Sequence, residues 1–308
     1  MSRRDPPPIA EVRRGIECCF PTLSRTRVRP VPAAETGWDS FAYIVGSGSI
    51  LKIARLPARP EMFTLLRRAG PRLARSLPLP IPLETHFSPR CRTLGVPIVV
   101  TLRIPGQQLR PVRFARLTSL ERAQAARDLG RFLAALHRFP VSEARRAGAR
   151  SWSRRNMARV LDRVRRNVFP RLEKAERTWA SRLFADHLDD PALWRFPRRL
   201  IHGDLGGDHI LIRKGKVTGV IDWGDAEVGD PAADFGGLVI SYGEKFARET
   251  MRHYHAPSEG LMRRPLDFYL PALPLRHLDF GVRTGQPALV RRARRQLREA
   301  IRGEPPHW

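Results

Sequence analysis

Residues 200–237 read LIHGDLGGDHILIRKGKVTGVIDWGDAEVGDPAADFGG, and this stretch decides the fold. It contains two short apolar runs, residues 209–212 and residues 217–221, on either side of a polar turn. Two such runs around a turn predict a β-hairpin. Asp204 lies on the loop that enters this hairpin, and Asp222 follows its second strand. We therefore expect the two carboxylates to meet at one edge of the fold.

Two carboxylates placed in this way suit phosphoryl transfer. One acid can accept the proton of an attacking hydroxyl while the other holds Mg²⁺ against the phosphates of a nucleotide. Phosphoryl transfer needs little else besides positioning and the neutralisation of charge. The pattern therefore predicts an enzyme that moves a phosphoryl group from a nucleotide to a hydroxyl.

The stretch resembles the aminoglycoside phosphotransferase and choline kinase superfamily, whose fold is related to that of protein kinases. Two motifs carry the resemblance, the His-Gly-Asp of residues 202–204 and the Ile-Asp-Trp-Gly of residues 221–224. It implies an α+β, two-lobed, protein-kinase-like fold, with an antiparallel sheet in a small N-lobe and a larger, mainly helical C-lobe. It also implies that Asp204 is the catalytic base and Asp222 the principal metal ligand. His202 belongs to the same catalytic motif, where we expect it to orient the loop.

Position 209, five residues after Asp204, departs from the most frequent pattern of the superfamily. It is histidine, where most members have asparagine. Magnesium prefers hard oxygen ligands, so a histidine is a less natural second ligand. Histidine here is nevertheless familiar in macrolide phosphotransferases and aminoglycoside 2''-phosphotransferases, and the spelling HGDLGGDHIL is most similar to the macrolide branch. We therefore expect His209 to join Asp222 as a metal ligand.

The Gly-Asp-Pro of residues 229–231 and Asp234 continue the family pattern. We expect them to support the catalytic loop. The alternative for any single aspartate near a turn is a cap or a hydrogen-bonded loop residue, which is the commoner case. A full set of such residues within one short window is rarely accidental, so the functional interpretation is favoured for the set.

Lysine is scarce in this chain, since only five of its 56 basic residues are lysines. Lys52 therefore stands out. It lies in an apolar run, residues 49–54, which follows a turn at residues 46–48 and a partner strand at residues 40–45. This is the arrangement expected of a kinase N-lobe, where a lysine on the third strand contacts the nucleotide phosphates.

Further nucleotide contacts are expected from residues near Lys52. Between residues 53 and 83 the only acidic residue is Glu61, so elimination makes it the candidate partner of Lys52. The alternative for Glu61 is a charge that stabilises the N-terminus of a helix. No GxGxxG sequence precedes the strands. We expect Gly37 and Ser40 to cover the nucleotide, because glycine permits close backbone approach and serine can donate a hydrogen bond.

The apolar run at residues 96–102 predicts the last strand of the N-lobe. Backbone groups of Val100, Thr101 and Leu102 are expected to hydrogen-bond the purine of ATP or GTP, and no rule of composition separates the two nucleotides. The alternative is a buried edge strand that binds no ligand.

The division between the lobes is expected after residue 103. Residues 1–103 would then form a nucleotide-binding N-lobe, and residues 104–308 a C-lobe with the catalytic loop, the metal site and the acceptor pocket. Helical periodicity predicts helices at residues 120–139 and 152–188. The first 35 residues and the last six are expected to fray.

The formal net charge of +26 would ordinarily suggest a nucleic-acid partner. The 51 arginines are spread along the whole chain, however, and no single basic stripe with interleaved aromatic residues is evident. The densest runs, within residues 145–166 and 291–298, have the spacing of solvated helix faces. We therefore expect no specific nucleic-acid partner.

Composition favours a cytoplasmic protein with no membrane partner. A chain of 308 residues with 42% hydrophobic content can bury a sizeable core. It has no apolar run of 18 residues, and its N-terminus lacks the apolar segment of a signal peptide. Cys18, Cys19 and Cys91 have neither the spacing of a metal site nor that of a disulfide framework, so we expect reduced thiols.

The acceptor is expected to be a small molecule with a hydroxyl group, either an antibiotic of the macrolide or aminoglycoside class or a metabolic alcohol. The positive chain disfavours a polycationic aminoglycoside and favours a weakly charged acceptor. Two other function classes stay open. A protein kinase is disfavoured because the motifs read HGD and IDWGD and no Ala-Pro-Glu sequence follows. A noncatalytic pseudokinase that binds nucleic acid through its basic surface is the other alternative.

Overall fold

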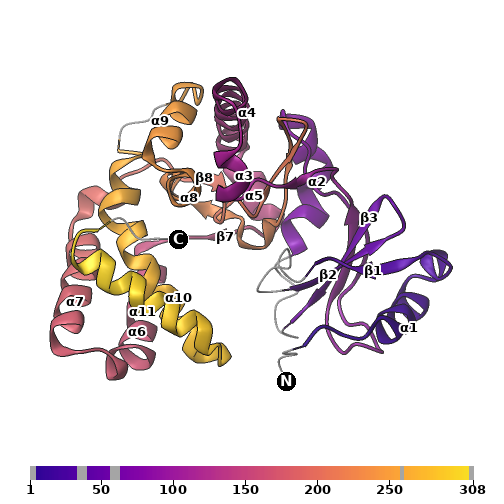
Figure 1. Ribbon diagram of the computed structural model, residues 1–308, viewed down its shortest axis with the longest axis horizontal. Coiled ribbons are helices and arrows are strands. Elements are labelled where there is room, and N and C mark those ends of the chain that lie inside the picture. The colour runs from indigo at the N-terminus through magenta and orange to yellow at the C-terminus, as the bar shows by residue number, and fades with distance from the viewer. Residues whose placement is uncertain (1–4, 33–39, 56–62, 257–259, 305–308) are drawn as a thin grey trace.

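The computed structural model describes residues 5–32, 40–55, 63–256 and 260–304, and it has an α+β architecture (Figure 1). Within these ranges the N-terminal part holds an antiparallel sheet of five strands in the order β1-β2-β3-β5-β4. The strands are β1 (Val28–Pro30), β2 (Ser40–Val45), β3 (Ser49–Ala54), β4 (Glu84–Ser88) and β5 (Ile98–Leu102). The predicted strands at residues 40–45 and 49–54 are confirmed.

Residues 5–32 contain ordered elements, so the expectation that the first 35 residues fray is wrong for this range. Helix α1 (Ile9–Cys19) and the 3-10 turn η1 (Pro21–Leu23) precede the edge strand β1. Val12 and Ile16 on α1 have exposures of 0% and 1%, and they belong to the apolar cluster beneath the sheet. Burial of these side chains, rather than helix propensity, holds α1 in place.

Helix α2 (Thr64–Ser76) joins the sheet to the rest of the molecule. Its apolar face belongs to the same cluster of buried residues as helix α4 (Ser119–Arg138). In the proline-rich connection that follows α2, the oxygen of Pro80 accepts a 3.0 Å hydrogen bond from the amide of Val220. This contact joins the N-terminal part to the catalytic hairpin.

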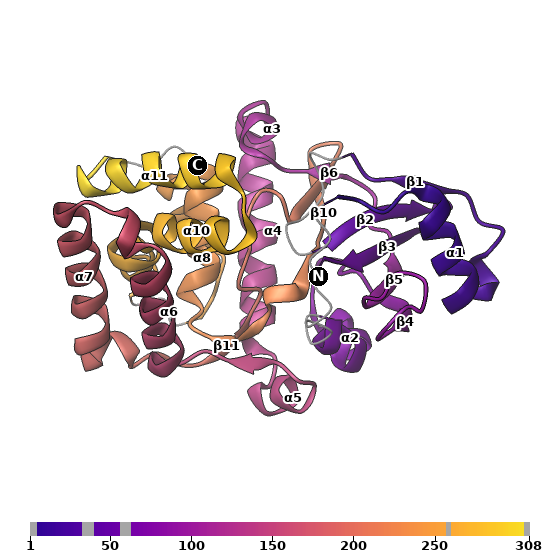
Figure 2. The same cartoon turned by 90° about the horizontal axis from the view of Figure 1, so that it is seen from below.

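The C-terminal part is mainly helical, and α4 lies between α8, α10 and α11 on one side and the N-terminal sheet on the other (Figure 2). A capping box between Thr118 and Glu121 starts α4, and Leu129, Phe132, Leu133 and Leu136 on its inner face are fully buried. The other helices are α3 (Pro111–Ala115), α5 (Val141–Arg146), α6 (Arg154–Asn167), α7 (Lys174–Asp189), α8 (Ala232–Tyr242), α9 (Glu244–Arg252), α10 (Leu270–Thr284) and α11 (Pro287–Ile301). The helices predicted for residues 120–139 and 152–188 are therefore confirmed as α4, α6 and α7.

Two small sheets carry the sequence motifs. One has the order β10-β9-β6 and the other the order β7-β11-β8. Their strands are β6 (Gln107–Gln108), β7 (Arg150–Ser151), β8 (Arg199–Ile201), β9 (Ile210–Arg213), β10 (Lys216–Val220) and β11 (Glu227–Gly229). The predicted hairpin is β9–β10, and it turns through Lys214 and Gly215, both of which have positive φ as a type I′ turn requires.

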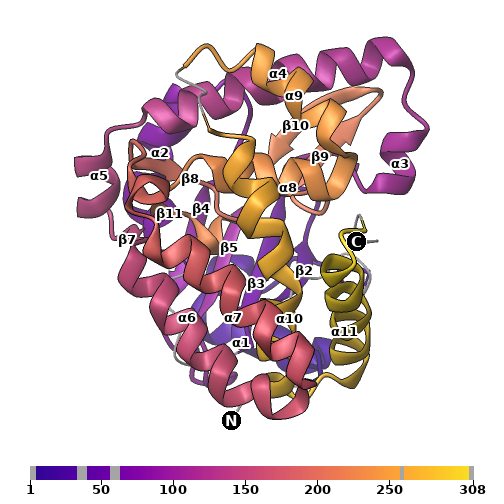
Figure 3. The same ribbon diagram turned by 90° about the vertical axis from the view of Figure 1, so that its left-hand side faces the viewer.

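A second apolar cluster lies among α6, α7, α10 and α11, which face the viewer in Figure 3. A π-helical turn, η7 (Pro265–Tyr269), leads into α10. β5 ends at Leu102, and β6 pairs with β9 of the C-terminal part. These two facts support the proposed division after residue 103. In the ranges that the structure describes, no helix has both the length and the apolar composition needed to cross a bilayer.

Candidate active site

The loop with the His-Gly-Asp motif leaves β8 in a conformation that only glycine accommodates easily. Gly203 has a φ of +80°, and a Cβ atom at this position would lie 2.5 Å from the backbone oxygen of Asp225. Any side chain would therefore push the loop away from the segment after Asp222. The glycine lets the chain turn so that Asp204 follows at the solvent side.

Asp234, on the first turn of α8, anchors this loop from beneath. Its Oδ2 accepts a hydrogen bond from the amide of His202 at 2.9 Å, and its Oδ1 accepts one from the amide of Gly203 at 2.8 Å. The Oδ2 atom also lies 3.1 Å from Nε2 of His137 on α4. Nδ1 of His137 in turn lies 2.7 Å from the hydroxyl of Tyr254. The expectation that Asp234 supports the loop is confirmed by these contacts.

The Asp234 carboxylate is completely buried but remains the favoured form. Burial alone would raise the pKa of Asp234. The hydrogen bond and charge of His137, together with the His202 backbone, outweigh burial and lower that pKa below its usual value. The carboxylate can therefore accept hydrogen bonds from the loop throughout the neutral pH range.

The His202 side chain points away from the solvent. Its Nε2 donates to the backbone oxygen of Ile221 at 3.0 Å, while Nδ1 faces the amide of Asp204 at 3.4 Å. The side chain is fully buried, and burial lowers the pKa of His202 to about 4. A neutral imidazole held between the two motifs supports the expected role in positioning the loop.

Asp204 is open to an incoming molecule, since 61% of its side chain is exposed. The surrounding protein raises the pKa of Asp204 to about 6, with further contributions from Asp225 and Asp222, while His209 and Arg276 oppose the shift. Solvent at the exposed edge moderates the burial effect. A carboxylate with a raised pKa is a stronger base than an ordinary aspartate.

His209 bridges the two carboxylates. Its Nδ1 donates to the backbone oxygen of Asp204 at 2.6 Å, and its Nε2 lies 3.8 Å from Oδ2 of Asp222. Burial alone would lower the pKa of His209, but Asp204 and Asp222 outweigh it and raise that pKa. The hydrogen bond at Nδ1 leaves the Nε2 lone pair of the neutral ring facing Asp222. This is the orientation that a metal-binding histidine requires.

Asp222 has a left-handed backbone conformation, with φ 66° and ψ 68°. Non-glycine residues in this region are uncommon and often occur at functional sites. Its Oδ1 accepts a 2.9 Å hydrogen bond from Nζ of Lys52 on β3. Although burial opposes ionisation, Lys52 and His209 hold the pKa of Asp222 well below its usual range. The salt bridge connects the N-terminal sheet to the catalytic hairpin.

The donor set at Asp222 fits Mg²⁺ only when the nucleotide contributes ligands. Within the described residues, no group of three or more histidine, cysteine or acidic side chains could hold a metal ion. Magnesium commonly takes one or two protein ligands and completes its shell with phosphate oxygens and water. One carboxylate with a neighbouring imidazole is consistent with that arrangement.

The predicted nucleotide contacts have mixed outcomes. Lys52 pairs with Asp222, whereas Gly37 and Glu61 lie outside the described residues. Ser40 is the first residue of β2 and is buried. The segment with Val100, Thr101 and Leu102 is the end of β5, which pairs with both β3 and β4 and so is not an edge strand.

Part of the hydrogen-bonding capacity of β5 is already used. The amide of Leu102 donates to Leu83, and the amide of Arg103 donates to Gly48, each at 2.8 Å. A purine contact at this strand must therefore come from other backbone groups near Leu102, whose side chain is 48% exposed. The binding of a purine at this position stays a prediction.

Charged residues beyond Asp204 mark the expected acceptor side. Glu227 on β11 lies opposite Ile201, the residue that precedes the catalytic motif. Burial raises the pKa of Glu227 to about 7, while Arg150 and Arg276 oppose that shift. Sequence reasoning missed Arg276, because it lies on α10, far along the chain from the motifs. The helical spacing of α10 predicts a helix there, but it does not predict that Arg276 lies near the site.

Asp230, in the Gly-Asp-Pro segment, binds two side chains that lie just before α10 in the chain. Arg264 donates two hydrogen bonds to its carboxylate, at 2.6 Å and 2.8 Å, and the Tyr269 hydroxyl donates a third at 2.8 Å. The bidentate geometry is the strong form of an arginine–carboxylate pair. It fixes η7 against the segment that follows Asp222. Support of the catalytic loop by residues 229–231 stays a prediction.

A profile of the phosphotransferase enzyme family matches residues 31–269. The chain belongs to this family. Viomycin phosphotransferase from Streptomyces vinaceus is 34% identical over 154 residues, which are 48% of this chain and 52% of that protein. An uncharacterised Bacillus subtilis protein, YcbJ, is 46% identical over 68 residues, 22% of each chain. These alignments span about half and about a fifth of the two relatives.

Solved structures confirm the two-lobed kinase-like fold of this phosphotransferase-family protein. The GDP and kanamycin complex of APH(2")-IIIa has a TM-score of 0.84 and 25% identity, covering 94% of this chain and 98% of that one. The apoenzyme of macrolide 2'-phosphotransferase MphH from Brachybacterium faecium has a TM-score of 0.68 and 23% identity, covering 90% and 93%. The resemblance inferred from residues 202–204 and 221–224 is thereby confirmed.

Proposed function

We propose that this protein transfers the γ-phosphate of ATP or GTP to a hydroxyl group of a small molecule. One observation carries the proposal: His209 joins an exposed carboxylate, Asp204, to a half-buried carboxylate, Asp222, that is paired with Lys52. The exposed acid suits an incoming hydroxyl. The half-buried acid with its lysine suits the phosphates and Mg²⁺ of a nucleotide.

Each side chain then has one role in the reaction. Asp204 orients the acceptor hydroxyl and takes its proton as the oxygen attacks the γ-phosphorus in line with the leaving group. Lys52 binds the nucleotide phosphates and neutralises part of their charge. Asp222 and His209 are the ligands proposed for Mg²⁺, which supplies further neutralisation of the phosphate oxygens when bound. His202 and Asp234 hold the loop so that Asp204 keeps its place.

The acceptor is proposed to be an antibiotic-like or metabolic alcohol with little positive charge. The relatives' names include a viomycin phosphotransferase, a kanamycin complex and a macrolide phosphotransferase. Arg276 lies close enough to influence the pKa of both Asp204 and Glu227. A guanidinium in this place, with Glu227 partly protonated near neutral pH, weakens the attraction for a polycationic aminoglycoside. This supports a macrolide or another weakly charged alcohol, and a role in antibiotic resistance is part of the proposal.

Magnesium-dependent release of ADP or GDP tests the proposal directly. Purified protein would be supplied with ATP or GTP and with separate pools of macrolides, aminoglycosides, metabolic alcohols and hydroxyl-bearing peptides. Acceptor-dependent release by a weakly charged alcohol supports the proposal. Release with aminoglycosides alone overturns the acceptor class, and a phosphopeptide product identifies a protein kinase. No release, with no change in melting temperature on adding either nucleotide, supports a noncatalytic pseudokinase.

The pH dependence of kcat/KM should report two groups, Asp204 and His209. Asp204 must be ionised to act as a base, and His209 must be neutral to bind a metal. Because the pKa of His209 is raised and that of Asp204 is raised to about 6, kcat/KM should fall as the pH drops through these pKa values, and by up to roughly hundredfold per pH unit below about pH 6, where both groups are protonated. An unperturbed aspartate would move its own share of the fall to near pH 4. The measurement is the initial rate between pH 4.5 and 8.5, at roughly constant ionic strength and saturating Mg²⁺.

His209→Asn is the control for this pH profile, because it installs the residue most frequent in the superfamily. The positive charge of His209 lowers the pKa of Asp204, so its removal should move the remaining fall to higher pH. A profile of the native protein that stays flat between pH 5 and 7 would contradict the assignment of Asp204 as the base.

Lys52→Met should raise the KM for the nucleotide by roughly tenfold, because it removes a charge-assisted contact to phosphate. Lys52→Arg is the matched control, since it keeps the charge but changes the shape of the donor group. We expect Lys52→Arg to lie between the native protein and Lys52→Met. Steady-state rates at varied nucleotide concentration, with the acceptor saturating, give these values. An unchanged nucleotide KM in Lys52→Met would remove Lys52 from the phosphate site.

A further inference from the structure

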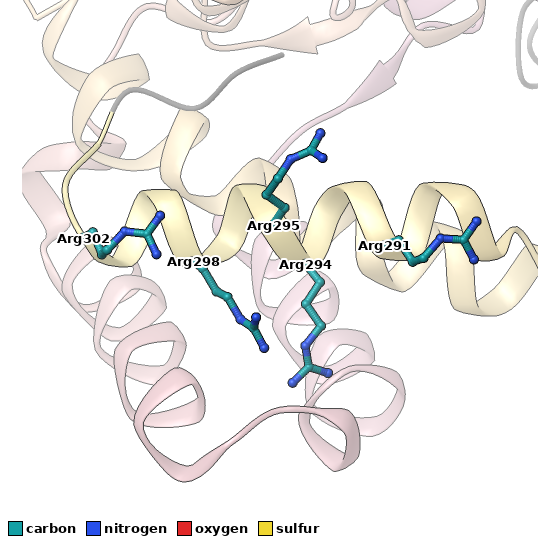
Figure 4. A pocket seen from close by; sticks show the side chains of 5 residues that line it. All are labelled: Arg291, Arg294, Arg295, Arg298 and Arg302. Carbon is teal, nitrogen blue, oxygen red and sulfur yellow. The ribbon is translucent and has the colours of Figure 1, made fainter.

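The hollow along α11 is lined by five arginines, which are Arg291, Arg294, Arg295, Arg298 and Arg302 (Figure 4). Four of these arginines face carboxylates, which are those of Glu173, Glu176, Glu299 and Glu304. Glu173 and Glu176 belong to the start of α7, so their ion pairs join α11 to α7. The carboxylates neutralise most of the positive charge of the hollow, which is therefore part of the helical scaffold.

The cysteines of the chain lie at the other end of the molecule. Cys18 and Cys19 are the last two residues of α1, and Cys91 lies in the loop between β4 and β5. Figure 2 shows α1 on the far side of the N-terminal sheet from α10 and α11. Cys18 is exposed, Cys19 is partly buried and Cys91 is completely buried. All three thiols are free in this structure.

The thiol of Cys91 lies against the last turns of α1. Its Sγ atom is 3.8 Å from the backbone oxygen of Gly15, and a Cβ atom on Gly15 would lie 3.4 Å from the same sulfur. In an α-helix the oxygen of residue 15 accepts the amide of residue 19, so this contact places Cys91 beside Cys19. Cys91 belongs to the apolar cluster beneath the sheet, and Cys19 packs against that cluster.

The side chain of Cys19 faces the loop that carries Cys91. Burial raises the pKa of the Cys19 thiol, and the neighbouring Cys91 thiol raises it further, while Ser88 and Cys18 oppose the shift. Ser88 is the last residue of β4, and the loop with Cys91 follows it. Two of the groups that act on Cys19 therefore come from this segment of the sheet.

The loop and the helix are held in this close approach from both sides. The amide of Cys91 donates to the oxygen of Val96 at 2.9 Å, and its oxygen accepts from the amide of Gly95 at 2.7 Å. On the helix, a Cβ atom at Gly15 would lie 2.9 Å from a methyl carbon of Leu94. The absence of a side chain at Gly15 therefore lets the loop come near enough for the two cysteines to meet.

We propose that Cys19 and Cys91 form a reversible disulfide by exchange with a small disulfide such as oxidised glutathione. The thiolate of Cys19, the more exposed of the two, attacks one sulfur of the oxidant, which forms a mixed disulfide and releases one glutathione that takes up a proton. The Cys91 thiol then loses its proton and attacks the Cys19 sulfur, and the second glutathione leaves as a thiol. Two protein thiols are oxidised, and one small disulfide is reduced to two thiols.

Two other uses of these cysteines fit the structure less well. Within the described ranges, no three histidine, cysteine or acidic side chains are placed to hold a metal ion. A bond between Cys18 and Cys19 would have to join adjacent residues of a helix, whose side chains point about 100° apart. The long-range pair, Cys19 with Cys91, is free of both difficulties.

The proposed bond would tie α1 to the loop that leads into β5. β5 pairs with β3, the strand that carries Lys52, so the bond would fix α1 to the sheet next to the nucleotide strands. A disulfide between residues far apart in sequence restricts the unfolded chain and so favours the folded one. We expect the oxidised protein to melt at least about 3 °C above the reduced protein.

Controlled oxidation followed by peptide mapping tests the inference on the whole chain. Protein is reduced with dithiothreitol, freed of it and incubated with oxidised glutathione at about pH 8, where more of each thiol is ionised. Remaining thiols are then counted and blocked. Trypsin cleaves after arginine, so Cys18 and Cys19 stay in the peptide of residues 15–25, and Cys91 is released in the peptide of residues 91–92. The expected product is these two peptides joined by a disulfide, with one of the three thiols left free.

Three variants identify the sulfurs that react. Cys18→Ser is the matched control, since it removes an exposed thiol from the adjacent position; it should still form the bond and keep no free thiol. Cys19→Ser should form no linked peptide, and oxidised glutathione should leave its melting temperature unchanged. Cys91→Ala should stop at a mixed disulfide between Cys19 and glutathione. Alanine suits the buried, apolar surroundings of residue 91.

Three outcomes would overturn the inference. One is native protein that carries glutathione on Cys18 or Cys19 but yields no linked peptide. Another is a disulfide-linked dimer through Cys18 on a non-reducing gel, with Cys91 still free. The third is a linked peptide in Cys19→Ser, which would assign the bond to Cys18. If Cys91→Ala melts early, the peptide maps of the native protein and of Cys19→Ser decide the matter. None of these readouts depends on the proposed phosphotransfer.

Discussion

Asp204→Ala is expected to lower kcat by roughly 10²- to 10⁴-fold, the usual contribution of a general base, while nucleotide affinity changes by less than about twofold. The separation follows from the geometry. The Asp204 carboxylate is 61% exposed on the acceptor side, whereas Asp222 and Lys52 form the half-buried pair expected to hold the phosphates. Removing Asp204 therefore leaves the nucleotide site in place and removes only the group that accepts the hydroxyl proton.

Two measurements decide the outcome for Asp204. Nucleotide affinity is measured by calorimetric titration with Mg²⁺ present, and turnover is measured with whichever acceptor the pooled assay identifies. Asp204→Asn is the matched control, because it preserves the shape of the side chain and removes its charge. We expect it to be as impaired as Asp204→Ala, since an amide cannot accept the proton. Near-native turnover in either variant would show that Asp204 is not the base.

Patterns that are local in sequence could be predicted from the chain alone. The strands at residues 40–45 and 49–54 and the catalytic hairpin were predictable because each apolar run ends at a turn with glycine or charged residues. The pairing of Asp204 with Asp222 followed from the same hairpin. Lys52 was found because lysine is so rare in an arginine-rich chain. In each case the deciding signal lies within a few residues of the feature.

Contacts between distant segments were not predictable. The structure places His137 against Asp234, the anchor of the catalytic loop, although the two residues are 97 positions apart in sequence. Arg276 comes near Asp204 only because η7 and α10 fold back over β11. The first 35 residues were expected to fray, yet the core face of helix α1 packs in the apolar cluster of the sheet. No rule of local spacing specifies such pairs.

Asp234→Ala should be the most destabilising change in the active-site region, with a loss of about 3–5 kcal/mol in the free energy of unfolding. The carboxylate is completely buried and serves three donors, the amides of His202 and Gly203 and the ring of His137. Alanine would leave these donors buried without an acceptor, and each unsatisfied group costs about 1–3 kcal/mol. Urea denaturation monitored by tryptophan fluorescence measures the loss.

Two further variants test whether the loss of stability comes from the buried hydrogen bonds of Asp234 or from removing any aspartate. Asp267→Ala removes an exposed partner of Arg263, so it should change stability by less than about 0.5 kcal/mol. Asp234→Asn keeps one acceptor oxygen. Its NH₂ group would face either the amide of Gly203 or the two donors of His202 and His137, so the loss in the free energy of unfolding should be intermediate. If Asp234→Ala unfolded at the same urea concentration as Asp267→Ala, the buried carboxylate would not be anchoring the loop. The position of Asp204 would then have to depend on Gly203 and His202 alone.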